Sequence, residues 1–593
     1  MRATNKKPQI KKVRRFTLSV FMLFLLFMAV SRVIYIYVEK ADFYAKQGDK
    51  RSIKQAKISA PRGVIEDRNG EVLALTTVLV SLGVDLEHLR LKPDMSGAQK
   101  IKAQNRIDKF RQDIDFLADK LGKTRSWLLD KTLNQKQKIK FKYLAREITP
   151  QLAAELKERK IPALVYERKF KRFYPKVKIG ASLLGFADFK EQGKAGIEAS
   201  FNEHLSGTDG KAWVRRDHLG NVIDYISMER PVQKGRALQL SIDFKIQEIT
   251  YLALAEAFKQ HQAHKAAAVV LNAKTGEILA VESLPSFNPN DTRQRTSKGT
   301  RNVAIQDLYE PGSTMKPFTV LAALNAGVID KDQSIHIGNG KLKVANATYR
   351  DSAKIESKNI DLATLLKKSS NVGAIKLGFM LETEKHRDFL HKLGFGQELQ
   401  IGLNSAVKGI LREADKITKV DHASMSFGHG LNTSLLQLAR SYLVLANSGK
   451  ISRLTVLKKT SPVKFKTISS AENANHVLDL LKQVVSKDGT AQQAAVEGFS
   501  VAGKTGTSHK FVNGRYAEKK YVGFFAGIVP ADNPQLVIAV LIDEPKGKKY
   551  FGGQTAAPVF AKIATDTLAY LGVKPDKQSS GKALIALKTG ADL

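Results

Sequence analysis

Four serines of this chain stand three residues before a lysine, a spacing that places both side chains on one face of a helix. A serine hydroxyl becomes a nucleophile when a base lies within hydrogen-bond reach, and a neutral lysine can be that base. Only the copy formed by Ser313 and Lys316 opens an apolar helical stretch, in EPGSTMKPFTVLAALNAG. The other copies begin at Ser405 between glycines, at Ser461 in a basic loop and at Ser579 in the C-terminal tail. We therefore expect Ser313 to be a nucleophile and Lys316 its base.

Lys316 can act as a base only when it is neutral, and an unperturbed lysine titrates near 10.4, roughly 3 units too high. Burial and a second nearby cation both lower the pKa of a lysine. The tripeptide Lys-Thr-Gly, which occurs three times in the chain, offers such a cation. Amides at the start of the predicted helix also point toward Ser313, which favours an anionic transition state.

The three Lys-Thr-Gly copies differ in their surroundings. The copy at Lys274 joins two apolar runs, 266–271 and 278–281, and is expected to be the turn of a β-hairpin. The copy at Lys588 lies in the tail, for which we expect disorder. Only the copy at Lys504, in GFSVAGKTGTSHK, is followed by further strand-like runs, YVGFFAGIVP and LVIAVLID. We therefore expect this copy on a sheet edge, where its glycines let a substrate backbone approach closely.

A third polar group is expected to relay protons, and Ser-x-Asn is a candidate pattern. It occurs four times, starting at Ser200, Ser286, Ser357 and Ser369. Ser369 and Asn371 follow an apolar helical run and two lysines, in LATLLKKSSNVGAIKLG. Polar side chains at such a corner can face a cleft between helices, and they can equally cap the next helix.

The bulk composition limits the possible classes of protein. With 593 residues, the chain is too long for one hydrophobic core, so two or more domains are expected. Its formal charge of +39 suggests an anionic environment, although nucleic-acid motifs that would accompany the charge are missing from the sequence. Cysteine is absent, which excludes disulfides, thiol catalysis and metal sites with cysteine ligands.

The N-terminus indicates the location of the chain. Residues 1–15 are basic and contain no acidic residue, and the apolar run 16–38 is long enough to span a bilayer as one helix. We therefore expect a cytoplasmic tail over 1–15, a transmembrane anchor over 16–38 and the rest of the chain outside the cytoplasm. A cleaved signal peptide is the alternative, but its apolar core is usually shorter and ends in a small-residue cleavage site.

Residues 39–240 are expected to form a β-rich, elongated pedestal without a catalytic constellation. A strand–turn–strand segment is predicted over 58–74, with its turn at residues 68–70. Helical periodicity is predicted between about 86 and 160. The basic tract 157–180 is expected to be a solvated face.

Residues 241–573 are expected to form a second domain, in which helices pack on an antiparallel sheet. Ser241 or Asp243 is predicted to cap its first helix, and residues 557–571 are predicted to form its last one. The remaining residues, 574–593, are expected to be a disordered tail. The predicted fold class is therefore α+β in several domains, behind one membrane helix.

The segments EPGSTMKP, SSNVG and GKTGT, in this order, resemble the three motifs of penicillin-binding proteins and serine β-lactamases. Together with RGVIEDRNG in the N-terminal part and a single anchor, they make the chain similar to the class B penicillin-binding proteins. The resemblance is greatest to the FtsI-type septal D,D-transpeptidases, because elongation-type relatives tend to carry Ser-x-Asp and Lys-Ser-Gly instead. One departure puts local loop geometry in doubt: Ser434-Leu435 replaces a common Thr-Pro.

The resemblance implies roles for the motif residues. Ser313 would attack the penultimate D-Ala carbonyl of a stem peptide and expel D-Ala, and Lys316 would accept its proton. Backbone amides of Ser313 and Thr507 would form the oxyanion hole. Proton relay would fall to Ser369, Asn371 and Lys504. Substrate binding would fall to Thr505, Gly506 and Thr507.

The resemblance also implies a biological setting. It predicts a penicillin-binding enzyme that cross-links peptidoglycan at the division septum, anchored in the cytoplasmic (inner) membrane. Its partners would be stem peptides, β-lactams as inhibitors, an FtsW-type glycan polymerase and other division proteins, with no metal or cofactor. The alternatives are an elongation-type transpeptidase, a D,D-carboxypeptidase or β-lactam hydrolase, and a non-catalytic scaffold for division.

Overall fold

The computed structural model describes residues 7–134, 139–216, 222–296, 299–512 and 515–577. Within them the chain forms two compact units, each assembled from several segments. Residues 62–77 and 170–206, from the stretch expected to be pedestal, belong to the same unit as the C-terminal half. Most of the expected tail, with Ser579 and the copy at Lys588, lies outside the described residues. Unit 1 comprises Met1–Pro61, Val78–Lys169 and Gly207–Lys234, and unit 2 comprises Arg62–Thr77, Phe170–Ser206 and Gly235–Leu593.

Unit 1 contains a long apolar helix, a three-stranded antiparallel sheet of order β1-β8-β9 and a small helical core. Among the described residues, one helix segment, Val13–Glu39, is long and apolar enough to cross a membrane, which fits the expected anchor. The predicted helical region is interrupted by a strand, β4, that pairs with β3. The elements are α1 (Lys7–Glu39), α2 (Ala41–Ser52), β1 (Ile53–Ile58), α3 (Gly97–Gln112), α4 (Ile114–Leu121), α5 (Arg125–Lys131), β4 (Phe141–Ile148), α6 (Pro150–Glu158), β8 (Gly210–Arg216) and β9 (Val222–Arg230), with β3 (Val72–Asp85) and β5 (Leu164–Phe173) shared between the units.

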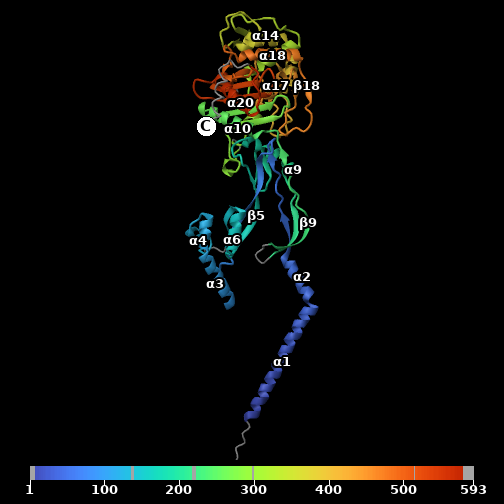
Figure 1. The fold of residues 1–593 in the computed structure, drawn as a ribbon, viewed down its shortest axis with the longest axis vertical. Helices are drawn as coiled ribbons and strands as arrows, with labels where there is room; N and C mark the ends of the chain where they lie inside the picture. The colour runs from blue at the N-terminus through green and yellow to red at the C-terminus, as the bar shows by residue number, and fades with distance from the viewer. Residues whose placement is uncertain (1–6, 135–138, 217–221, 297–298, 513–514, 578–593) are drawn as a thin grey trace, which may run out of the picture. The chain divides into compact units, whose positions relative to one another are not determined.

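Unit 2 is built on a five-stranded antiparallel sheet of order β12-β11-β21-β20-β19. Helices α10 and α20 pack on each other and on this sheet, as Figure 1 shows, and α17 and α18 also contact both the sheet and each other. Every residue of β21 is buried as a result. The elements of this core are α10 (Phe244–Gln260), β11 (Lys265–Asn272), β12 (Ile278–Leu284), α17 (Leu435–Ala446), α18 (Ala471–Val484), β19 (Ala502–Val512), β20 (Arg515–Val529), β21 (Leu536–Asp543) and α20 (Ala557–Tyr570).

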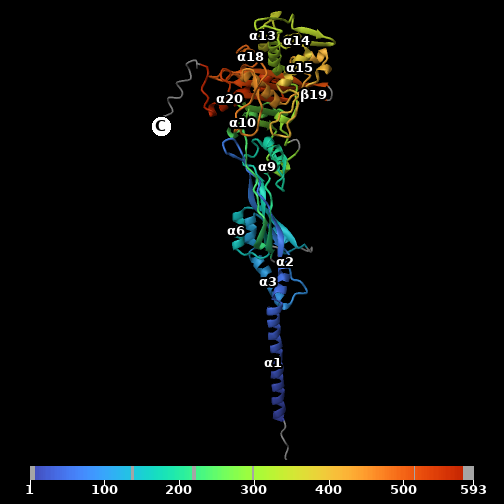
Figure 2. The same ribbon diagram turned by 90° about the vertical axis from the view of Figure 1, so that its right-hand side faces the viewer.

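The remaining elements of unit 2 include the helices α13, α14 and α15 labelled in Figure 2, and α12 contacts α14 and α18. The elements before α12 are β2 (Ile65–Glu66), α7 (Ala181–Leu184), β6 (Phe186–Ala187), β7 (Gly193–Ala195), α8 (Gly196–Ser200), α9 (Asn202–Leu205), β10 (Leu238–Gln239), η1 (Thr292–Gln294), α11 (Val303–Gln306) and η2 (Gly312–Met315). Those from α12 onward are α12 (Lys316–Asn325), β13 (Ile335–His336), β14 (Lys341–Val344), β15 (Ala347–Arg350), β16 (Asn359–Ile360), α13 (Leu362–Lys367), α14 (Asn371–Met380), α15 (Thr383–Lys392), η3 (Ala414–Lys416), α16 (Lys419–Met425), β17 (Lys450–Ser452), β18 (Phe465–Thr467), η4 (Gln492–Ala494) and α19 (Gly552–Thr555).

Local signals explain where several of these elements begin. Asp243 caps α10, because its carboxylate accepts from the backbone N–H groups of Lys245 at 3.0 Å and Ile246 at 3.3 Å. The alternative cap, Ser241, instead donates its hydroxyl to the carbonyl of Ile278. The turn predicted at residues 68–70 is present, with Gly70 at φ +88° and strands β2 and β3 on either side.

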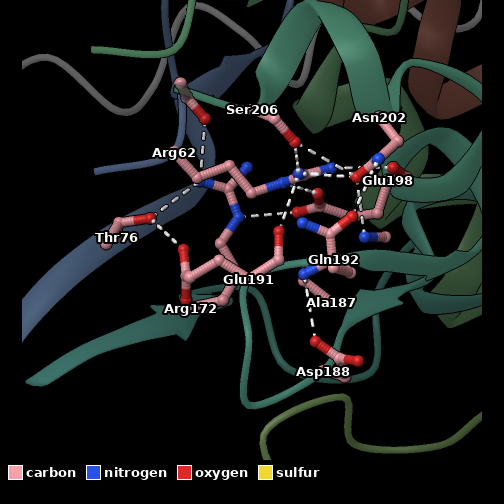
Figure 3. A network of polar contacts seen from close by, with 12 residues as sticks. Arg62, Thr76, Arg172, Ala187, Asp188, Glu191, Gln192, Glu198, Asn202 and Ser206 are labelled. Carbon is pink, nitrogen blue, oxygen red and sulfur yellow. Dashed lines mark hydrogen bonds and ion pairs between the residues drawn. The ribbon is translucent and has the colours of Figure 1, made fainter. Parts of the chain in front are cut away.

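A buried ion cluster in unit 2 shows that the basic tract 157–180 is not solvated throughout, contrary to the prediction from the sequence. Arg172, in the basic tract expected to be solvated, is 3% exposed and bonds Glu198 at 2.6 Å (Figure 3). The same carboxylate bonds Arg62 at 2.6 Å, and all three side chains are at most 1% exposed. Arg172 also donates to the carbonyl of Gly63 at 2.7 Å. A sequence run rich in lysine and arginine does not reveal that one of its members meets a buried carboxylate from elsewhere in the chain.

Candidate active site

Ser313 lies in the 3-10 helix η2, which runs directly into α12 at Lys316. The expected helix start is therefore a tight turn followed by an α-helix, with Pro317 in the first turn as predicted. Gly312, at φ +56°, donates its N–H to the carbonyl of Gly428 at 2.9 Å and so fixes the entry to this turn. The Ser313 side chain is half-buried, whereas Lys316 is fully buried.

The amine of Lys316 meets the predicted Ser-x-Asn corner. Its Nζ donates to the Ser369 carbonyl at 2.6 Å and to Asn371 Oδ1 at 2.8 Å, and it lies 3.1 Å from the Ser369 hydroxyl. The three other Ser-x-Asn copies make no such contact with Lys316 among the described residues. The corner thus contacts the first residue of α12, Lys316, from 53 residues further along the sequence.

The amine of Lys504 reaches the same corner from the sheet. Lys504 lies on the edge strand β19 and is 0% exposed, and its Nζ contacts the Ser369 hydroxyl at 3.0 Å. One hydroxyl therefore touches both amines, Lys316 at 3.1 Å and Lys504 at 3.0 Å. Because a hydroxyl can donate and accept, Ser369 can pass a proton between the two lysines.

The sequence left open whether the Ser-x-Asn segment is a polar corner of the site or the cap of the next helix, and in the structure it is both. Ser370 caps α14, because its hydroxyl accepts from the backbone N–H of Gly373 at 2.9 Å. Ser369 adopts a left-handed conformation with φ +60°, an uncommon backbone state for a residue other than glycine. This conformation places both its carbonyl and its hydroxyl within reach of the Lys316 amine.

Asp351 holds the corner in place and was not among the predicted site residues. Its Oδ1 accepts from the backbone N–H of Asn371 at 2.6 Å and of Val372 at 2.9 Å, and its Oδ2 accepts from the Ser370 hydroxyl at 2.9 Å. No local pattern marks this carboxylate, since it lies in a loop 20 residues before Asn371. Only the tertiary structure shows that it positions the corner.

The rest of the Lys-Thr-Gly strand packs against the nucleophile turn. A Cβ atom on Gly506 would lie 2.7 Å from the carbonyl oxygen of Pro311, so only glycine allows this close approach. Thr505 bonds the hydroxyl of Thr490 at 3.2 Å, and Thr507 Oγ1 accepts from the backbone N–H of Gly552 at 3.0 Å. The strand edge therefore runs beside Ser313 through Gly506.

Burial sets the protonation of the two lysines. Burial lowers the pKa of Lys316 far below its ordinary value, the nearby charge of Lys504 lowers it further, and Asp351 opposes the shift. Burial also lowers the pKa of Lys504 to about 7. The direction agrees with the sequence prediction that a base lysine here needs burial and a second cation. Lys316 is therefore the amine better suited to be neutral and accept a proton.

The first Lys-Thr-Gly copy is a hairpin turn, as predicted. Lys274 and Thr275 donate their backbone N–H groups to Asn272 Oδ1, both at 3.0 Å, and Gly276 has φ +69°. The strands on either side, β11 and β12, pair antiparallel. Lys274 is exposed, so this copy has no part in the site.

The departure at Ser434 leaves the local structure regular. Ser434 caps α17 in a capping box with Gln437, whose N–H donates to the serine hydroxyl at 3.2 Å and whose Oε1 accepts from the serine N–H at 3.0 Å. The helix that follows is buried along most of its length.

A serine beside a buried lysine, a second lysine on an edge strand and an antiparallel sheet between helices define a serine-type acyltransferase. The family model described as Penicillin binding protein transpeptidase domain matches residues 266–565, and that described as Penicillin-binding Protein dimerisation domain matches residues 57–240. This chain belongs to the penicillin-binding proteins that combine these two domains, which confirms the predicted family, fold class and enzyme class.

Individual relatives are similar over nearly their whole length. The chain is 36% identical to a Probable peptidoglycan D,D-transpeptidase PenA of Neisseria gonorrhoeae, over 98% of this chain and 96% of that protein. It is also 36% identical to Peptidoglycan D,D-transpeptidase FtsI of Buchnera aphidicola subsp. Schizaphis graminum, over 96% of this chain and 98% of that protein. The solved transpeptidase domain of Burkholderia pseudomallei penicillin-binding protein 3 is 36% identical with a TM-score of 0.53, covering 57% of this chain and 98% of that one.

Proposed function

We propose that this protein is a peptidoglycan D,D-transpeptidase of the FtsI type that cross-links stem peptides at the division septum. The observation that carries the proposal is the convergence of two lysines on the Ser369 hydroxyl: Lys316, which lies one helical turn after Ser313, and Lys504. A buried lysine base next to a serine is one arrangement that activates a hydroxyl for acyl transfer. The relatives named as peptidoglycan D,D-transpeptidases, similar over nearly the full length, supply the substrate class.

In this scheme the Ser313 hydroxyl oxygen attacks the carbonyl carbon of the penultimate D-Ala, and Lys316 takes its proton. The amide bond to the terminal D-Ala then breaks, and the leaving amine receives a proton through Lys316 and Ser369. Backbone N–H groups of Ser313 and Thr507 stabilise the oxyanion of the tetrahedral intermediate. An amine of a neighbouring stem peptide attacks the resulting ester, forms the cross-link and releases Ser313.

The residues of the edge strand bind the donor peptide in this scheme. Thr505 and Thr507 hold the terminal carboxylate, and Gly506 leaves room for the peptide backbone. Asn371 and Lys504 complete the proton network and orient the donor, Lys504 in its charged form. Support comes from the close packing of Gly506 against Pro311, which keeps the strand beside the nucleophile turn. The apolar helix near the N-terminus anchors the protein as a single pass in the inner membrane, with residues 1–15 inside and the catalytic unit outside. There it works with an FtsW-type glycan polymerase and other division proteins.

Labelled penicillin followed by peptide mapping tests the proposal. A β-lactam carries a strained amide that acylates the same serine, so we expect one stable adduct, on Ser313. A donor peptide ending in D-Ala-D-Ala is then offered with an amine acceptor, and we expect a cross-linked product. An adduct on another residue would contradict the assignment of Ser313, and release of D-Ala without transfer to the amine would identify a carboxypeptidase instead.

The pH profile of acylation is a second expectation. Lys316 must be neutral to accept a proton, whereas the scheme needs Lys504 charged, and burial lowers the pKa of Lys504 to about 7. We therefore expect the rate of Ser313 acylation to fall as the pH rises through about 7, because Lys504 loses its proton, and to fall on the acidic side as Lys316 gains one. Stopped-flow measurement of acylation between acidic and alkaline pH checks this.

The variant Lys504→Arg sharpens the test, because arginine stays charged throughout this range. The alkaline decline should then disappear in whatever activity remains. An acylation rate that does not change with pH in the wild type would contradict the assigned roles of the two lysines.

A further inference from the structure

A small hairpin, β14–β15, adjoins the catalytic corner and carries cations on one face. Its register pairs Lys341 with Arg350 directly across the strands. Because side chains alternate along a strand, Lys343 shares the face of Lys341. Leu342 and Tyr349 occupy the other face and pack against the core of unit 2. We call the outward surface formed by Lys341, Lys343 and Arg350, all three exposed, the basic hairpin face.

This arrangement is electrostatically unfavourable in the absence of an anion. Like charges directly opposite each other on an antiparallel pair destabilise the pairing. Neither Lys341 nor Arg350 forms an ion pair with any of the residues that the structure describes. The nearest carboxylate in sequence, Asp351, accepts from Ser370, Asn371 and Val372 instead. The hairpin thus presents three cations beside the site, and none of them is ion-paired to a residue that the structure describes.

A second like-charged pair in the chain serves as a comparison. Lys211 and Arg230 also face each other, on β8 and β9 of unit 1. There the Arg230 guanidinium donates to the carbonyl of Asp209 at 3.0 Å, and the Asp209 carboxylate forms an ion pair with Lys57 at 2.6 Å. That pair therefore lies beside an ion-paired carboxylate, whereas no ion pair with a described residue involves a cation of the basic hairpin face.

The hairpin contacts Asn371 of the catalytic corner. The backbone carbonyl of Arg350 accepts from Asn371 Nδ2 at 2.9 Å, so the end of β15 touches the residue that orients the donor in the proposed scheme. A guanidinium next to an ammonium is suited to a planar carboxylate, which it can bind through two parallel hydrogen bonds. Stem peptides carry carboxylates on residues before the D-Ala-D-Ala end.

We propose that the basic hairpin face binds an ionised carboxylate of the donor stem peptide, upstream of its D-Ala-D-Ala end. This inference rests on the proposed function, since it concerns the substrate of the same site. The face selects donors whose upstream carboxylate is free over donors in which it is amidated. It acts on substrate binding and takes no part in the covalent steps at Ser313.

The test compares two synthetic peptides ending in D-Ala-D-Ala, one with a free upstream carboxylate and one with that group amidated. The full-length protein in detergent is assayed for D-Ala release. In the variant Lys341→Glu, we expect the preference for the free carboxylate, as a ratio of kcat/KM values, to fall about fivefold through KM, the size expected for an exposed ion pair. Added salt should reduce the preference of the wild type in the same direction.

The same variant carries a second, independent readout. Glutamate opposite Arg350 replaces repulsion by attraction, so the melting temperature of Lys341→Glu should be equal to or higher than that of the wild type. A loss of preference in a protein that is no less stable cannot come from unfolding. The matched control is Lys211→Glu, which makes the same change opposite Arg230 and should leave the preference unaltered.

Two outcomes would overturn the proposal. One is a wild type that releases D-Ala from both peptides equally well, and the other is a Lys341→Glu variant that keeps the full preference. Both leave the proposed function standing, provided that penicillin labels Ser313 and that a cross-linked product forms when an amine acceptor is added. If the wild type acts on neither peptide and is not labelled, the proposed function itself fails.

Discussion

Replacing Lys504 with methionine is expected to slow acylation of Ser313 by labelled penicillin about 100-fold or more, the size typical of a lost proton-transfer group. Lys504 is fully buried and contacts the Ser369 hydroxyl at 3.0 Å, so its removal breaks the link between sheet and corner. Methionine fills most of the lysine volume, which limits the effect of a cavity. The measurement is the rate of Ser313 acylation. The melting temperature of the variant checks that the protein is folded under the conditions of the assay.

The same variant should also shift the pH dependence of the residual rate. The charge of Lys504 is one of the causes that lower the pKa of Lys316. Without it the pKa of Lys316 rises, so a higher pH is needed before Lys316 is neutral and can accept a proton. The acidic limb of the profile should therefore move to higher pH.

Lys274 provides the matched control, because it belongs to the same tripeptide but lies exposed in a hairpin turn. Lys274→Met should leave both the acylation rate and its pH profile unchanged. Equal effects of the two substitutions, or a Lys504→Met variant that is acylated at the rate of the wild type, would contradict the role assigned to the strand of Lys504.

Replacing Glu198 with alanine is expected to destabilise unit 2 by about 3–5 kcal/mol, because the change leaves two buried guanidinium groups without the carboxylate that pairs with both of them. Arg62 and Arg172 each bond this carboxylate at 2.6 Å, and each side chain is 1% exposed (Figure 3). A buried charge that loses its partner retains the full cost of desolvation. Chemical denaturation and the melting temperature of the full-length protein in detergent measure the effect.

An exposed ion pair in the same unit gives the control. Lys245 and Glu248 lie 2.7 Å apart on α10 with side chains that are 55% and 31% exposed. Glu248→Ala should change the free energy of unfolding by less than about 1 kcal/mol, as surface ion pairs usually do. Similar losses of stability for the two variants would show that the Glu198 cluster does not hold the unit together.

Lys-Thr-Gly and Ser-x-x-Lys each occur several times in the chain, and local sequence context was enough to select one copy of each. Lys274 sits between two apolar runs that form β11 and β12, whereas Lys504 lies on β19 with β20 and β21 still to follow. The alternation of apolar residues and the order of strands along the chain can be read from the sequence. The hairpin turn predicted at Lys274 and the strand predicted at Lys504 therefore agree with the structure. The same holds for Ser313 and Lys316, whose spacing of three residues is a local property of a helix.

Other residues that hold the site or the fold together could not be found in this way. Asp351 holds Asn371 across 20 residues, and Arg172 meets Glu198 within a basic tract that was expected to be solvated. An isolated acidic residue in a loop and a basic residue on a strand look ordinary in sequence, because their partners are distant along the chain. Only packing brings such groups within hydrogen-bond distance and removes water from around them.

The sequence by itself determined which residue types are present, their order along the chain, the apolar helix at the N-terminus and the family. The tertiary structure decided that Lys316 and Lys504 meet at one hydroxyl of Ser369 and that both are fully buried. The pKa of a lysine depends on burial and on charges nearby in space, and neither is a property of the local sequence. The motifs therefore identify the lysines, whereas the fold lowers the pKa of both by burying them.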